Sequence, residues 1–297
     1  TGFAAVRDQA ARTESAASDR ATQLAEVATD CASCSAALRA VAAASDERLE
    51  ALGGLWDPWG GTPPEGASAP AAVSEAPTDV SAFVTWLART ATRDLEIAAD
   101  TNRTSADEAR TLSAAALGRY ASAVTIAQAY GIDLDAGLDQ ALLINDRVNA
   151  ASRQGVQTWS IDLFDAPGIS ASFAPSGKDL ASSQELSSAV ATWDCTASTL
   201  PQAQVSAGTL TDAYAVSGEL LARADVALRA GAADTRTPRC TLGFLDAPSL
   251  ASNLLAADSA MLASNSSDVR AAGASAALAD IQQWAPRTPL PALIGTR

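Results

Sequence analysis

Residues 3–55 read FAAVRDQAARTESAASDRATQLAEVATDCASCSAALRAVAAASDERLEALGGL, and this stretch decides the fold. Its apolar residues recur at steps of three and four, and no Gly or Pro interrupts them before Gly53, which is typical of amphipathic helix. A single helix of that length would extend ~75 Å, which is too long for a compact domain. We therefore predict two helices with a break near Thr29, Asp30 and Ser33, where capping residues cluster. The apolar stripe comprises Val6, Ala10, Ala17, Leu24, Val27, Cys31, Cys34, Leu38, Val41, Leu52 and Leu55.

Helix-start and helix-stop signals divide the rest of the first 131 residues. Gly53 and Gly54 end the second helix, and a segment rich in Pro, Gly, Ser and Ala follows. Ser105 precedes Glu108 by three residues, the spacing of a capping box, and Gly131 is a helix stop. The expected elements are a loop over residues 55–78 and helices over residues 79–101 and 105–130. Together with the first two helices they predict an antiparallel four-helix bundle in residues 1–131.

A second helical set is expected in residues 132–297. The predicted helices cover residues 135–159, 179–200, 202–230, 249–264 and 267–284. The intervening residues 164–178 contain Pro and Gly, and the three prolines of residues 286–297 predict a tail that lies extended on the surface. No strand-like alternation is sustained. The sequence thus predicts an all-α protein of two tandem up-down bundles, with domains at 1–131 and 132–297.

Composition and charge exclude several classes of partner. The chain has 71 alanines among 297 residues, a formal charge of −14, an estimated pI near 4.3 and a single lysine, Lys178. Nucleic acid and anionic membranes bind clustered basic residues, so neither is an expected partner. No apolar run approaches the ~18 residues of a transmembrane helix. Because the chain begins at Thr1 without a leader, we expect that a leader, with any lipid anchor it carried, has been removed.

Four cysteines fit an oxidising compartment outside the cytoplasm. Three pairings are open, and we predict Cys31 with Cys34 and Cys195 with Cys240, because each pair then fastens its own half of the chain. A four-thiolate zinc site is the competing interpretation. The spacing of Cys31 and Cys34 suits it, but Cys195 and Cys240 lie far apart in the sequence, which favours disulfides.

The chain contains no histidine, and this excludes most metal and hydrolytic chemistry. A ferritin-type di-iron centre needs Glu-x-x-His pairs, and Ser-His-Asp or Cys-His catalysis needs an imidazole. An all-carboxylate metal site would need acids that face a core, and acids on helices usually form a solvated face. We therefore expect no catalytic residue, metal or cofactor. The acids considered for such a site are Glu14, Glu26, Asp94, Glu96, Asp100, Glu219 and Asp225.

Two further motifs have a structural and a functional interpretation. The run Asp133-x-Asp135-x-Gly137-x-Asp139 resembles a calcium loop but lacks the required Gly and Glu, so helix capping is favoured. The run Gly53-Gly-Leu-Trp56-Asp-Pro-Trp59-Gly-Gly61 places two tryptophans in a turn. They form either a binding platform for a peptide, lipid or glycan, or a plug at the end of an alanine-lined bundle. The plug is favoured, because buried aromatic side chains dominate core area.

The helix pattern resembles a known family. The stretch Leu220-Leu-Ala-Arg-Ala-Asp-Val-Ala-Leu-Arg-Ala-Gly231, a helix opening near Ser249, and a last helix ending at Trp284 before Pro-Leu-Pro-Ala-Leu at 289–293 carry the resemblance. In the front half, Cys-Ala-Ser-Cys at 31–34 and the run from Leu49 to Trp56 are similar to an accompanying region. The family is the ferritin-like domain of unknown function of lipoproteins and secreted proteins in high-GC Gram-positive bacteria. Its helices often carry histidine, whereas residues 221–226 here read Leu-Ala-Arg-Ala-Asp-Val.

That family has no established activity, so the resemblance implies a fold and a compartment but no reaction. With the missing catalytic residues, it leads us to expect a non-enzymatic binding or scaffold module of the cell envelope, with a protein or another envelope component as partner. The alternative is a degenerate ferritin-like protein that binds metal through carboxylates alone.

Overall fold

The computed structural model describes residues 2–57, 59–60, 65–66, 73–134, 180–207, 213–240, 242 and 246–296. Within these residues the protein is all α, with eight α-helices packed as two groups of four. The first group is α1 (Phe3–Val27), α2 (Ala32–Ala51), α3 (Val80–Ala99) and α4 (Ala106–Tyr130). The second group is α7 (Gln184–Ala207), which follows the short 3-10 helix η1 (Leu180–Ser182), then α8 (Ala213–Arg229), α9 (Ala247–Met261) and α10 (Ser267–Trp284).

Local capping sets the ends of the helices in the first group. The predicted break between α1 and α2 is confirmed, and Cys31 is the N-cap of α2. The predicted capping box is also confirmed: the Ser105 side chain accepts from the Glu108 N–H, and the Glu108 carboxylate accepts from the Ser105 N–H. Gly131 ends α4 in the left-handed conformation, at φ 65°, which glycine adopts without strain.

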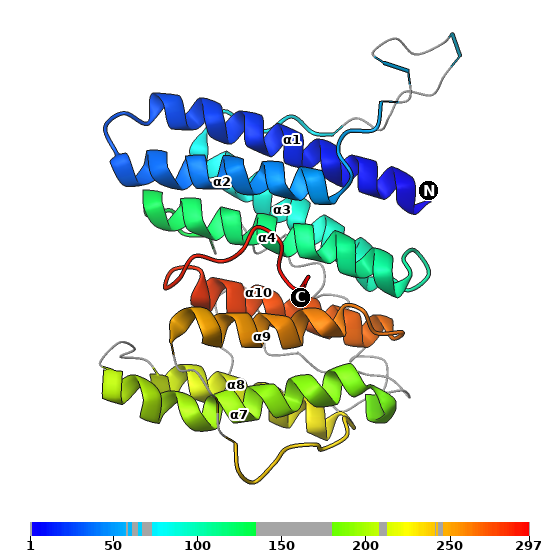
Figure 1. Cartoon of the computed structure of the whole chain (residues 1–297), viewed down its shortest axis with the longest axis vertical. Coiled ribbons are helices and arrows are strands. Elements are labelled where there is room, and N and C mark those ends of the chain that lie inside the picture. Colours follow the sequence, from blue (N-terminus) through cyan, green and yellow to red (C-terminus); the bar gives the residue numbers. More distant parts are fainter. Residues whose placement is uncertain are drawn as a thin grey trace.

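The helices stack as four layers of two (Figure 1), each layer consisting of two helices that pack side by side. The order along the long axis is α1 with α2, α3 with α4, α9 with α10, and α7 with α8. Contacts between α4 and α10, and between α3 and α10, join the two groups. None of the helices among the described residues is both long and apolar enough to span a membrane.

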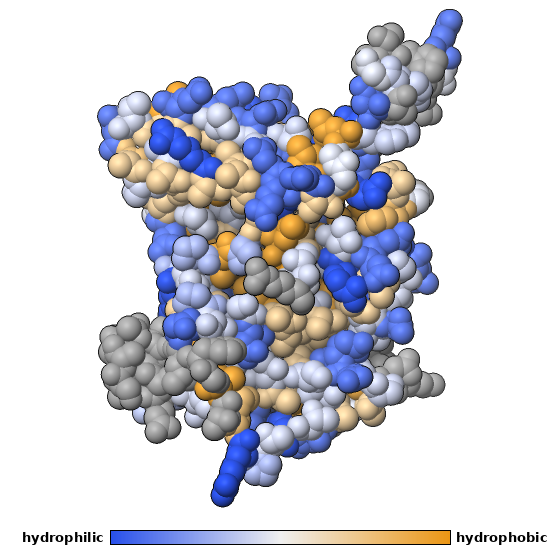
Figure 2. Space-filling view, viewed as in Figure 1, coloured by the Kyte–Doolittle hydropathy of each residue, from blue (hydrophilic) through white to orange (hydrophobic). Residues whose placement is uncertain are grey.

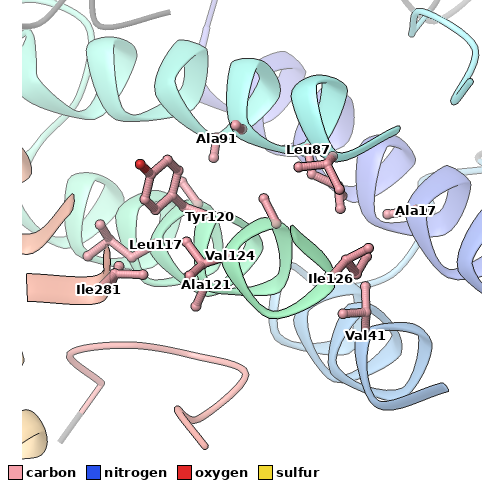
Figure 3. Packing of buried hydrophobic residues seen from close by; sticks show 14 of the residues in the cluster. Ala17, Val41, Leu87, Ala91, Leu117, Tyr120, Ala121, Val124, Ile126 and Ile281 are labelled. Carbon is pink, nitrogen blue, oxygen red and sulfur yellow. The ribbon is translucent and has the colours of Figure 1, made fainter. Parts of the chain in front are cut away.

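Small side chains let the layers approach closely. Ala10, Ala17 and Ala21 of α1 are completely buried, and alanine is frequent throughout the core. Larger residues fill the space between neighbouring layers, as Figure 3 shows for Leu117 of α4 and Ile281 of α10, which belong to one apolar cluster. This cluster therefore extends from the first group into the second.

The predicted boundary between two helices of the second half is wrong. The sequence placed a helix end at Leu200, before Pro201, but α7 runs through Pro201 to Ala207 and α8 begins only at Ala213. The loss of one N–H donor at Pro201 was thus not enough to end the helix. The helix expected over residues 135–159 and the irregular segment 164–178 lie outside the described residues.

The C-terminal segment lies on the surface as predicted, but it turns and bends instead of running extended. Residues 285–296 fold back across α4, where the Ile294 N–H donates to the Ala114 carbonyl at 3.2 Å, and Ile294 is 2% exposed. Figure 2 shows apolar residues gathered over the middle of the face that this segment crosses. Gly118 permits the approach, because a Cβ at that position would stand 1.8 Å from the Ala292 carbonyl oxygen.

Replacement of Gly118 tests this contact. We expect Gly118→Ala to lower the free energy of unfolding by about 1–3 kcal/mol, because the added methyl group forces the C-terminal segment off α4. The segment should also become accessible to limited proteolysis. Gly218→Ala is the matched control: Gly218 lies within α8 with no atom within 4 Å of the new Cβ, so this change should stabilise the helix by about 0.5–1 kcal/mol. Equal stabilisation by both changes would contradict the packing described.

Candidate functional site

One charged residue from each of α1 to α4 meets in the middle of the first group. Glu14 comes from α1, Arg48 from α2, Asp94 from α3 and Arg119 from α4. Glu14, Arg48 and Arg119 are 0% exposed and Asp94 is 1% exposed. Buried charges are rare unless they are paired, so this arrangement is the main polar feature of the core. We call these four residues the central ion network.

The central ion network alternates in sign. The two oxygens of Glu14 accept from different arginines, Oε2 from Arg48 Nε at 2.9 Å and Oε1 from Arg119 Nε at 2.8 Å. Arg119 Nη1 then donates to Asp94 Oδ2 at 2.8 Å. Glu14 therefore bridges the two arginines and Arg119 bridges the two acids, so two positive and two negative charges are balanced inside the core.

Partners outside the network bind Asp94 and Arg48. Arg93, which is partly exposed, donates from Nε to Asp94 Oδ1 at 2.8 Å, and Arg48 Nη2 donates to Ser45 Oγ at 2.9 Å. All four carboxylate oxygens of Glu14 and Asp94 thus accept from guanidinium groups. A metal ion in this position would have to displace arginines from both acids and would meet their positive charge.

The pKa values of the two buried arginines shift in opposite directions. Burial lowers the pKa of Arg48, because desolvation outweighs its attraction to Glu14. Burial acts in the same direction on Arg119, but the charges of Glu14 and Asp94 outweigh it and raise the pKa of Arg119. The guanidinium of Arg119 therefore holds its proton more tightly than that of Arg48.

The second group has a polar centre of its own, again with one residue from each helix. Arg223 of α8 donates two hydrogen bonds to Asp280 of α10, from Nη1 to Oδ2 and from Nη2 to Oδ1, each at 3.0 Å. Asp258 of α9 accepts from the Trp193 indole N–H of α7 at 2.8 Å. The Arg223 guanidinium lies 5.2 Å from the centre of the Trp193 ring, a favourable cation–π position.

Asp258 and Asp280 form a buried carboxyl pair. Burial, followed by the charge of Asp280, raises the pKa of Asp258 well above its usual value, and Arg223 offsets this only in part. In this second centre two carboxyl groups lie near one arginine, whereas the first has equal numbers of acids and arginines.

The acids considered from the sequence fall into three classes. Glu14 and Asp94 do face the core, Glu26 is exposed, and Glu96, Asp100, Glu219 and Asp225 are partly exposed. Sequence reasoning missed Asp258 and Asp280. For Asp258 the signal was that it is the one charged residue of α9, and for Asp280 that it follows an uncharged run of Ala, Gly, Ser and Leu in α10. Within the residues that the structure describes, no three or more His, Cys, Asp or Glu side chains group as metal ligands.

The predicted disulfides are confirmed, one in each half of the chain. Cys31 and Cys34 have a Cα–Cα distance of 5.2 Å, and Cys195 and Cys240 one of 5.4 Å. Bridged sulfurs leave no thiolate for the competing zinc site. Two disulfides are consistent with an oxidising environment outside the cytoplasm.

Trp56 of the Gly53–Gly61 run does not plug the bundle. Trp56 is 57% exposed and its neighbour Leu55 is 49% exposed, so the interpretation as a buried plug is wrong for Trp56, whereas Trp59 is partly exposed. The Trp56 and Trp59 rings pack against each other, with centroids 5.8 Å apart. Gly53 and Gly54 turn the chain with positive φ, and Arg12 Nη2 donates to the Trp56 carbonyl at 3.2 Å. The turn is therefore held from both sides, while the Leu55 and Trp56 side chains face solvent.

The calcium-like run extends from Asp133 into residues 135–139, which lie outside the described residues. Comparison of the chain with family models, curated proteins and solved structures found no match.

The carboxyl pair predicts a specific pH dependence. An acid whose pKa is higher in the folded than in the unfolded protein adds stability at low pH, and this stability is lost as the pH rises through the folded pKa. Asp258→Asn mimics the protonated acid and does not titrate. We expect the unfolding free energy of Asp258→Asn, relative to the unsubstituted protein, to increase as the pH rises from about 4, near the unfolded pKa of Asp.

Denaturant unfolding at a series of pH values measures this difference. Asp46→Asn, which replaces an exposed acid on α2, serves as the control and should leave the pH profile unchanged. Parallel pH profiles for Asp258→Asn and the unsubstituted protein would show that Asp258 does not take up a proton on folding.

Proposed function

We propose that this chain is a non-enzymatic binding or scaffold module that acts outside the cytoplasm, and that Leu55, Trp56 and Trp59 belong to its contact loop. A protein or another component of the cell envelope is the proposed partner. The proposal keeps the ferritin-like character of the tandem bundles and a secreted or lipid-anchored location, both from the family resemblance. The observation that carries it is the exposed Trp56, which packs against the partly exposed Trp59.

The exposure of Trp56, beside the partly exposed Trp59, favours a role in binding. Transfer of a tryptophan side chain out of water is favourable, and tryptophan is among the residues most enriched at the energetic centres of interfaces. The loop is also restrained, since Arg12 holds the Trp56 carbonyl and Asp57 Oδ1 accepts from the Trp59 N–H at 3.1 Å. A restrained aromatic pair loses little conformational entropy when a partner covers it.

The buried charges support a structural role for the cores. The central ion network is internally paired, and Arg223, Asp280, Asp258 and Trp193 pair in the second group. The alternative, a metal protein that uses carboxylates alone, is less well supported because arginine occupies every oxygen of Glu14 and Asp94.

Substitution of both contact-loop tryptophans tests the proposal. We expect a Trp56→Ala, Trp59→Ala variant to unfold within about 1 kcal/mol of the unsubstituted protein, since Trp56 contributes little to the core. Its retention on isolated bacterial cell-wall sacculi, assayed by co-sedimentation, should fall more than about tenfold.

Tyr214→Ala provides the matched control, because Tyr214 is an aromatic residue that is 74% exposed on α8, away from the contact loop. It should leave retention unchanged. Retention that survives the double substitution, or unfolding of the double variant, would contradict the proposed role of the loop.

A further inference from the structure

The sequence Cys31-Ala-Ser-Cys34 opens α2, and its disulfide has a different environment from the second one. Cys31 is the N-cap of α2, in extended conformation, and Cys34 is in the first turn. Cys31 is partly exposed, whereas Cys34 is 3% exposed. An incoming thiolate therefore has access to Sγ of Cys31 and not to Sγ of Cys34.

The start of α2 supplies hydrogen bonds for a thiolate at Cys31. Its Sγ accepts from the Cys34 backbone N–H at 3.2 Å, and the Ser33 hydroxyl lies 3.4 Å away. The positive end of the helix dipole adds to this, and cysteines at helix N-termini are those whose thiol pKa is commonly lowered.

Negative charges near the Cys31–Cys34 pair would disfavour a thiolate at Cys31, but they do so only weakly. The carboxylates of Glu26, near the end of α1, and Asp30, in the turn, are exposed and screened by solvent. From α4, burial raises the pKa of Tyr130, which stays neutral.

A reduced Cys34 would also have a partner in place. Its Sγ lies 3.4 Å from the Ala129 carbonyl oxygen of α4, a position in which a thiol S–H donates. Both sulfurs therefore have hydrogen-bond partners in the reduced state without movement of the backbone.

The α1–α2 turn does not depend on the disulfide. The Ser35 hydroxyl donates to the Ala25 carbonyl at 3.0 Å, and Leu24, Leu38 and Val41 belong to the core. A bridge between residues three apart closes a very short loop and constrains the unfolded chain little. Cys195–Cys240 spans 45 residues and ties α7 to the segment after α8, which fits a structural bridge.

We infer that Cys31–Cys34 is a redox-active disulfide that exchanges with thiols of a partner protein, with Cys31 as the attacked sulfur. The partner thiolate attacks Cys31 Sγ, the S–S bond breaks, and its electron pair goes to Cys34 Sγ, which takes up a proton. A second thiolate of the partner then attacks the partner sulfur of the mixed disulfide and releases the Cys31 thiolate. The partner dithiol is oxidised by two electrons and the Cys31–Cys34 disulfide is reduced.

Val27 offers a place for an apolar side chain of that partner. It is 74% exposed at the end of α1, four residues before Cys31. The turn lies at the opposite end of the α1–α2 pair from the contact loop (Figure 1), so the inference does not rest on the proposed binding function. The exchange is stoichiometric, one partner dithiol for each disulfide, and is compatible with a non-enzymatic module.

Thiol reactivity in the full chain tests the inference. Cys34→Ser frees the Cys31 thiol and leaves Cys195–Cys240 intact, while Cys240→Ser frees Cys195 as a control. The rate of reaction with 5,5′-dithiobis(2-nitrobenzoic acid) is measured over pH 5 to 10. We expect a midpoint for Cys31 at least about one pH unit below the ordinary cysteine pKa of about 8.5, and an ordinary midpoint or no reaction for Cys195.

Reduction of the unsubstituted protein gives an independent test that needs no variant to fold. In graded dithiothreitol, mass spectrometry after alkylation should show Cys31 and Cys34 reduced before Cys195 and Cys240, with helical circular dichroism unchanged. A Cys31 midpoint at or above about 8.5, or resistance of Cys31–Cys34 until the helices melt, would overturn the inference.

Discussion

The central ion network is the constraint on which the first group of helices depends. Alanine-rich faces pack closely, but they are nearly smooth, so one helix can shift along another with little change in contact. Glu14, Arg48, Asp94 and Arg119 remove that freedom, because a shift of one turn in any helix would strand a buried charge. The cost of an unpaired buried charge is several kcal/mol, much more than small differences in alanine packing.

The second group uses the same principle with different chemistry. Arg223 and Asp280 pair, and Asp258 accepts from the Trp193 indole N–H. A fourth buried arginine, Arg270 of α10, donates to the carbonyls of Ala98 and Thr104 and so fixes the second group against the α3–α4 connection. Buried arginines thus fix the arrangement of the helices within each group and between the two groups. The two proposed sites of interaction, the contact loop and the Cys31–Cys34 turn, lie on the surface.

Local signals made much of the fold predictable from sequence. The apolar stripe, the Ser105–Glu108 capping box and Gly131 depend on residues a few positions apart, and the helix ends they predicted in the first group are those of the structure. The disulfide pairing followed from spacing. Pairings across helices were not predictable, because they depend on the rotation of each helix. Arg119 was visible only as an interruption of an apolar stretch, and nothing near it in the sequence identifies Glu14 or Asp94 as its partners.

One residue in the sequence could have indicated where the C-terminal segment packs: Gly118, which lies within the buried helix α4. Glycine weakens a helix interior, so its presence there indicates a close approach by another backbone. The exposure of Trp56 had no sequence signal, because an aromatic residue in a Gly-rich turn fits either a plug or a platform.

Neutralising Glu14 tests the role of the central ion network most directly, because this residue alone bridges both arginines. Equilibrium denaturant unfolding of Glu14→Gln is compared with that of Glu26→Gln, which replaces an exposed glutamate of the same helix. The account predicts a loss of about 3–5 kcal/mol for Glu14→Gln and a change within about 0.5 kcal/mol for Glu26→Gln. Equal, small effects of the two substitutions would contradict the claim that buried ion pairing fixes the helices.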